Sequence, residues 1–129
     1  MFQIDPMSRT PIYEQLIEQT EKFILTGAIS AGDQIPSVRS VSVELSVNPV
    51  TILKAYSDLS SRGIIKSVPG RGYFVCSDAK EKLSAGKSEL LFEVSTLASE
   101  LALAGIPMEA VIKKIEEAYG NFERKDDDK

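Results

Sequence analysis

The segment from Ile35 to Val75 constrains the fold of this chain more than any other stretch. Ser37 comes after a proline and can cap a helix, and Asn48-Pro49 gives a second start signal eleven residues later. Asparagine accepts hydrogen bonds from the free N–H groups of a first helical turn, and proline fits that turn because it needs no hydrogen-bond acceptor. Two short helices therefore follow each other closely, with Ser46-Val47 as the tight turn between them.

The apolar residues of this segment support that interpretation and add a hairpin. Val38, Val41 and Leu45 share one face of the first helix, whereas Ile52, Tyr56 and Leu59 share one face of the second, which Gly63 ends. Two β-rich stretches, 64–68 and 73–76, then flank a Pro-Gly-Arg-Gly turn at 69–72. We therefore expect a mainly α fold with a small β-hairpin, namely a winged helix-turn-helix followed by a short helical region.

The flanking segments complete the predicted organisation. Thr10-Pro11 can begin a helix that Gly27 ends, with Thr10 as its cap, and residues 33–35 are either a short strand or an extended link. The polar stretch 77–88 is either a linker or the weak first turns of a helix. We expect a winged helix over 9–77, a helical dimerisation or effector region over 78–120, and a flexible tail over 121–129, which is highly charged.

The second region has an apolar stripe that must be buried somewhere. Gly105 and Pro107 separate two helices in it. The stripe can pack against the first helix of the same chain, or it can pair with a second copy. Because two helices are too small for an independent ligand-binding domain, we favour a homodimer. The residues expected at a dimer or effector interface are Leu90, Val94, Leu97, Leu101 and Ile115.

Composition limits the possible functions. The 129 residues include no histidine and a single cysteine, so a disulfide within the chain is excluded and a metal site is improbable. No cofactor is expected. No P-loop or nucleotide-binding glycine pattern is present, so we do not expect an enzyme. No apolar run could span a bilayer and no signal peptide is evident, so a cytoplasmic location without membrane association is expected.

Charge is unevenly distributed along the chain. The formal net charge is −4, which by itself argues against nucleic acid. From Gln34 to Val75, however, the chain has five basic residues and only two acidic ones, whereas from Asp78 onward it has twelve acidic and eight basic residues. Attraction to phosphate depends on the local field, so this segment remains suited to double-stranded DNA.

A winged helix-turn-helix places its second motif helix in the major groove, with the first residues of that helix nearest the bases. Arg39 can grip the phosphate backbone, the backbone near Ser37 can add an N–H contact to phosphate, and Arg71 can enter the minor groove from the hairpin tip. Thr51 and Lys54 can bind phosphate or a base, and Val50 can contact a thymine methyl group. The expected DNA-binding residues are Ser37, Arg39, Asn48, Val50, Thr51, Lys54, Gly70 and Arg71.

Each assignment has a plainer alternative. Arg39 can be a surface residue paired with a carboxylate, and Lys54 can be an ordinary solvated charge. Asn48 is needed as a cap in any case, and the Pro-Gly-Arg-Gly stretch can be only a turn. Tyr56 is expected in the core, with a lesser chance that its hydroxyl meets phosphate.

Taken together, these motifs resemble the GntR family of bacterial transcription regulators. The resemblance rests on Pro-Ser-Val-Arg at 36–39, Asn-Pro-Val-Thr at 48–51, Lys-Ala-Tyr at 54–56 and Gly-Arg-Gly-Tyr-Phe-Val at 70–75. The Asn-Pro-x-Thr-x-x-Lys-Ala-Tyr form and the short C-terminal region are similar to its YtrA-like subfamily. Many relatives have glycine where this chain has Ser46, and polar or basic residues where it has Pro49, Val50 and Leu53.

The resemblance implies a winged helix that binds a palindromic operator as a dimer, usually as a repressor, with Arg39, Thr51, Gly70 and Arg71 at the DNA. A small effector, if one exists, is expected at the helical dimer interface. The alternative function is a winged-helix module that binds another protein without sequence-specific DNA binding.

Overall fold

The computed structural model describes residues 1–127, which form two compact units, Met1–Ala85 and a second unit that starts at Gly86. The first unit contains α1 (Ile12–Leu25), β1 (Gln34–Ile35), α2 (Val38–Leu45), α3 (Pro49–Ser61), β2 (Ile65–Val68), β3 (Gly72–Val75) and the start of α4 (Ala79–Lys87). The second unit contains α5 (Leu90–Leu103) and α6 (Met108–Asp127).

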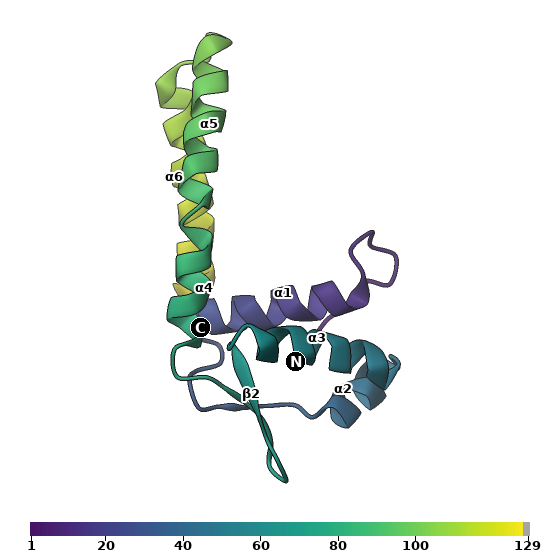
Figure 1. Ribbon diagram of the computed structural model, residues 1–129. Helices are drawn as coiled ribbons and strands as arrows, with labels where there is room; N and C mark the ends of the chain where they lie inside the picture. Colours follow the sequence, from purple (N-terminus) through teal and green to yellow (C-terminus); the bar gives the residue numbers. More distant parts are fainter. Residues whose placement is uncertain (128–129) are drawn as a thin grey trace. The chain divides into compact units, whose positions relative to one another are not determined.

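The first unit is a three-helix cluster with a small antiparallel sheet. Helix α3 packs against both α1 and α2, and the strands lie in the order β1-β3-β2. The β2–β3 hairpin extends away from the helices as a wing (Figure 1). The sequence prediction of a winged helix-turn-helix is therefore confirmed, and residues 33–35 include a true strand. The buried apolar core includes Leu16, Ile24, Ile35, Val41, Ile52, Tyr56, Leu59, Ile65 and Val75.

The N-terminal residues extend this core beyond the predicted boundary at residue 9. Phe2 is only 5% exposed, and its ring lies 6.2 Å from the ring of Phe23, centroid to centroid. Gln19 accepts from the backbone N–H of Gln3 at 2.9 Å. Phe2 and Ile4 alternate with polar residues, but a pattern of this length does not by itself predict burial.

Helix α1 begins differently from the prediction. Its N-cap is Pro11, which provides no side-chain cap, so the expected capping role of Thr10 is wrong. The Gln15 side chain instead donates to the Thr10 carbonyl at 2.8 Å and to the Asp5 carbonyl at 2.9 Å. A buried glutamine from inside the helix thus ties down the segment that precedes it.

The polar stretch 77–88 folds largely as a helix rather than a linker. Ala79 and Leu83 of α4 are buried in the core of the first unit. The compact unit therefore extends to Ala85, past the boundary at residue 77 that the sequence suggested.

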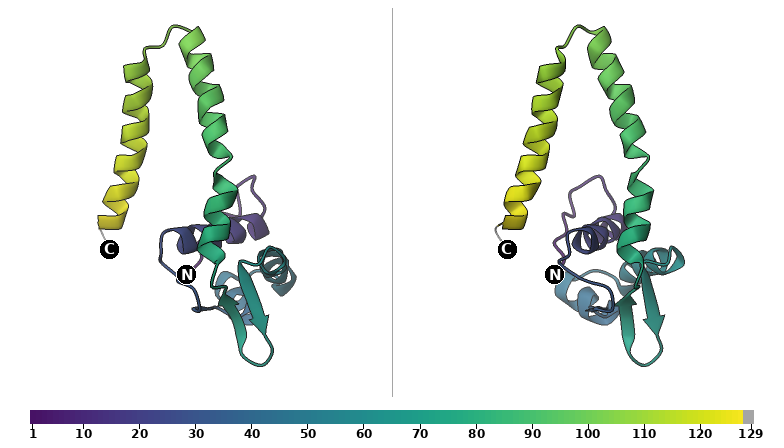
Figure 2. Two further views of the ribbon diagram at one scale, coloured as in Figure 1. Left: turned by 60° about the vertical axis from the view of Figure 1, so that its left-hand side comes forward. Right: turned by 90° about the vertical axis from the view of Figure 1, so that its left-hand side faces the viewer.

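The second unit is a helical hairpin in which α5 and α6 run antiparallel (Figure 2). Gly105, which was expected to separate these helices, adopts φ +80° between them. Helix α6 continues to Asp127, through most of the stretch expected to be a flexible tail. Glutamate, arginine and lysine, which this stretch contains, are good helix formers. Residues 128 and 129 of that tail lie outside the described residues.

None of the helices in residues 1–127 combines the length and apolar character that crossing a membrane requires.

Candidate DNA interface

Two side-chain caps and one strained residue fix the helix-turn-helix. Ser37 Oγ accepts from Ser40 N–H at 3.0 Å, and Asn48 Oδ1 accepts from Val50 N–H at 2.9 Å. Between the helices, Ser46 adopts φ +54° and ψ +43°, the left-handed conformation that favours glycine. Ser42 Oγ then donates to the Val47 carbonyl at 2.6 Å. Ser37 and Asn48 therefore have the capping roles predicted for them, and their side-chain oxygens are already used in the free protein.

Helix α3 has a buried and an exposed face, as its spacing predicted. Ile52, Tyr56 and Leu59 are fully buried. Val50 is 69% exposed, Leu53 and Lys54 are exposed, and Thr51 is half-buried. The exposed start of α3 is thus largely apolar, with Thr51 and Lys54 as its hydrogen-bonding side chains among residues 50–54. Such a surface can meet thymine methyl groups in the major groove but offers few donors to base edges.

Tyr56 belongs to the core. Its hydroxyl donates to the Pro36 carbonyl at 2.7 Å, and its ring meets the edge of Tyr73 with centroids 5.0 Å apart. Burial, with a smaller contribution from Tyr73, raises the pKa of the Tyr56 phenol well above its ordinary value. The single hydroxyl proton is already used, so Tyr56 is not a donor for phosphate. Its role is to join α3 to the residue just before Ser37.

The arginines of the segment 34–75 fall into two classes. Arg62 is neutralised: Nε lies 3.0 Å from Asp58 Oδ2, and Nη1 lies 3.3 Å from Glu21 Oε2. Arg39 and Arg71 are exposed, and neither forms an ion pair with any carboxylate that the structure describes. Among the side chains that the structure describes, residues 1–122, no carboxylate pairs with Arg39, so the alternative of a paired surface residue has no support there. Arg39 and Arg71 therefore contribute more to the local positive field than Arg62 does. A count of charges along the sequence gives all three the same weight.

Lys54 has a partner that sequence spacing did not reveal. Its Nζ lies 3.8 Å from the centroid of the Tyr13 ring on α1. A cation above an aromatic face is held by about 0.5–1 kcal/mol at an exposed site, without loss of its charge. Tyr13 therefore restricts where the ammonium group can reach. The contact joins residues 41 positions apart, so only the packing of α1 on α3 could show it.

The wing presents Arg71 at its tip. Arg71 N–H donates to the Val68 carbonyl at 2.9 Å and closes the turn, while Gly70 and Gly72 adopt φ +77° and +118°. A residue with a β-carbon would be strained at either glycine. Arg71 lies between them with its side chain exposed.

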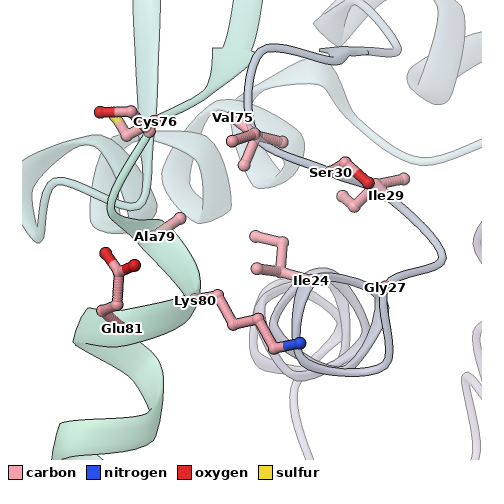
Figure 3. Close-up of a pocket in the computed structure, with 11 residues that line it drawn as sticks. Ile24, Gly27, Ile29, Ser30, Val75, Cys76, Ala79, Lys80 and Glu81 are labelled. Carbon is pink, nitrogen blue, oxygen red and sulfur yellow. The ribbon is translucent and has the colours of Figure 1, made fainter.

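Surface pockets occur in both units. One, of about 270 Å³, lies in the first unit between the end of α1, residues 29–31, the end of β3 and the start of α4 (Figure 3). The other, of about 390 Å³, lies between α5 and α6. Leu90, Val94, Leu97, Leu101 and Ile115 line neither of them. Within the described part of the chain, no cluster of three or more histidine, cysteine, aspartate or glutamate residues could hold a metal ion.

Comparison with known proteins decides the family. Residues 12–75 match the family model described as bacterial regulatory proteins, gntR family. The chain is 40% identical over 118 residues to the HTH-type transcriptional repressor YtrA of Bacillus subtilis (strain 168), a match that covers 91% of each protein. The chain belongs to the GntR family. It is a DNA-binding transcription regulator, and the resemblance seen in the sequence to the YtrA-like subfamily is confirmed.

Solved structures of GntR proteins agree with the fold. A GntR family transcriptional regulator from Listeria monocytogenes is 34% identical, with a TM-score of 0.70 over 88% of this chain and 98% of the other. The AraR DNA-binding domain, solved in complex with operator ORX1, is 36% identical, with a TM-score of 0.51 over 59% of this chain and 93% of the other. The likeness to an operator-bound domain supports the DNA-binding function, whereas the protein-interaction alternative receives no support.

Proposed function

We propose that this GntR regulator is a homodimeric repressor without enzymatic activity that binds a palindromic operator in the cytoplasm. Residues 9–77 would carry the DNA-reading region and 78–120 the region for dimerisation and any effector. In this proposal Arg39 and Lys54 bind phosphate, Thr51 and Val50 face the major groove, and Arg71, between Gly70 and Gly72, enters the minor groove. Ser37 and Asn48 hold the helix starts near the backbone. The observation that carries the proposal is the exposed and unneutralised state of Arg39 and Arg71.

The proposal of a dimer is supported by apolar residues that the single chain leaves uncovered. No residue of α5 is buried, and Leu97, in the middle of its stripe, is 58% exposed. Leu90, Val94 and Leu101 of α5 and Ile115 of α6 are exposed as well. Apolar surface of this extent is usually covered by a partner. A two-fold partner would place two copies of α3 at half-sites about one DNA turn, roughly 34 Å, apart.

The DNA contacts are tested through the salt dependence of binding. The probe is a duplex selected by the protein from random-sequence DNA. Each phosphate contact contributes about 0.9 to the slope of log affinity against log salt concentration. We expect Arg39→Ala and Arg71→Ala each to weaken binding and to lower the slope by about one. Arg62→Ala is the matched control, because its charge is already paired, and it should leave the slope nearly unchanged.

Two results would contradict these assignments. Equal slopes for the wild type and Arg39→Ala would remove Arg39 from the phosphate contacts. A loss of slope in Arg62→Ala as large as in Arg39→Ala would show that general charge, rather than a defined surface, drives binding. Absence of both specific and non-specific DNA binding would favour the protein-interaction alternative.

The dimer is tested by introducing a charged residue into the proposed interface. Leu97→Lys should convert the protein to a monomer in sedimentation analysis and weaken operator binding with it. Leu103→Lys is the control, since Leu103 is also on α5 but is 92% exposed and outside the stripe. A dimer that survives Leu97→Lys would place the interface elsewhere.

An effector at this interface would act by changing the spacing of the half-sites. Titration of the operator complex with metabolite fractions tests this directly. If no fraction shifts operator affinity, the result contradicts the proposed effector but not the proposed dimer.

A further inference from the structure

We propose that Gln34 is a positioning residue for the wing: its side chain holds the backbone of Arg71 so that the guanidinium group is presented to DNA in a fixed place. The inference rests on the proposed role of Arg71 at the DNA. It assigns a function to a residue of β1, a strand that lies outside both the helix-turn-helix and the hairpin.

The geometry begins with the short strand β1. Gln34 pairs with Phe74 and Ile35 with Tyr73, so β1 lies along β3 on the side opposite β2. From this position Gln34 Nε2 donates to the Arg71 carbonyl at 2.7 Å. The Arg71 N–H donates to the Val68 carbonyl at 2.9 Å. Both polar backbone groups of Arg71 are therefore held, one by the hairpin turn and one by a separate strand.

The second glycine of the Pro-Gly-Arg-Gly turn makes this contact possible. A β-carbon at Gly72 would lie 2.8 Å from Gln34 Nε2, closer than real contacts allow, and φ is +118° there. At Gly70 a β-carbon would meet no atom within 4 Å. Gly70 thus serves the conformation of the turn, whereas Gly72 also leaves the room that the Gln34 amide occupies. The glycines beside Arg71 therefore have different functions.

The contact matters because the wing tip has little other support. Strands β2 and β3 are each four residues long, and β1 adds only two paired residues, neither of them at the tip. Two-stranded hairpins are only marginally stable in water. A tip fixed before binding loses less conformational freedom on the DNA, which favours affinity. Gln34 extends the support of the third strand to the residue that carries the charge.

The experiment is a double-mutant cycle on the full chain, with the same selected duplex as probe. Gln34→Met keeps the length and the neutral charge of the side chain but removes the donor. We expect it to weaken operator binding about three- to ten-fold, the range for loss of one hydrogen bond. In an Arg71→Ala background the same change should have no further effect, because residues that act through one another are not additive. The melting curves of the wild type and Gln34→Met should coincide, since Gln34 is exposed.

Gln19→Met is the matched control. Gln19 also binds a backbone group, the N–H of Gln3, but it lies on α1 and not at the wing. It should leave DNA affinity unchanged. The inference is overturned if Gln34→Met binds like the wild type, or if it weakens binding by the same factor with and without Arg71. Failure of the proposed role of Arg71 looks different: Arg71→Ala would then bind normally, and the inference about Gln34 would fall with it.

Discussion

Replacing Ser46 with glycine should stabilise this protein. Ser46 is the one non-glycine residue with positive φ in the described chain, and it lies at the turn that sets α2 against α3. A left-handed conformation costs an L-residue about 1–2 kcal/mol, and glycine avoids that cost. Glycine also lowers stability by about 0.4–1 kcal/mol, because it increases the conformational entropy of the unfolded chain. The exposed Ser46 side chain makes no hydrogen bond with residues 1–122, whose side chains the structure describes, so its removal costs little else.

The expected gain from Ser46→Gly is therefore about 0.5–1 kcal/mol. For a unit of this size, that raises the melting temperature by roughly 2–8 °C. Urea denaturation followed by far-UV circular dichroism measures the free energy, and tyrosine fluorescence provides a second probe because the chain has no tryptophan.

Two control variants separate conformational strain from other effects. Ser46→Ala keeps a β-carbon and should give no gain. Ser57→Gly, at an exposed site inside α3, should destabilise by several tenths of a kcal/mol, because glycine is a poorer helix former than serine. A loss of stability in Ser46→Gly as large as in Ser57→Gly would refute the strain argument.

Three further changes test other parts of the structure. Asn48→Ala removes the cap of α3 and should cost about 1 kcal/mol in urea denaturation, whereas Asn48→Asp should retain most of the stability. Tyr56→Phe loses the bond to Pro36 and should be less stable at neutral pH. Because burial raises the pKa of Tyr56, the wild type should lose stability as pH rises above about 10, so the two unfolding curves should converge there; a constant gap would refute this. Tyr13→Leu should leave the fold intact but change DNA affinity only when Lys54 is present, as a cycle with Lys54→Ala would show.

Local rules were enough to predict much of the DNA-reading region. Capping by Ser37 and Asn48, and the glycine-dependent hairpin turn, depend on residues within four positions of each other, so the sequence displays them directly. The buried face of α3 follows from helical spacing in the same way. Arg39 and Arg71 are expected at the DNA because charged residues beside a helix start and at a hairpin tip stand out in the sequence.

The remaining features depend on tertiary packing. The Gln34–Arg71 and Lys54–Tyr13 contacts join residues that are 37 and 41 positions apart, and no local pattern connects them. The role of Gln15 in tying down the N-terminal segment was hidden because glutamine inside a helix looks like an ordinary surface residue. Pro11 stands at the cap position expected of Thr10, and the Gln15 side chain binds the Thr10 carbonyl.

Hydrogen–deuterium exchange of the protein, alone and bound to its selected operator duplex, tests the central claim most directly. The account predicts slower exchange on DNA binding in the peptides that cover 37–54 and 69–72, with the peptide around Arg62 unchanged. Protection centred on Arg62, or a wing and α3 that exchange equally fast with and without DNA, would contradict it.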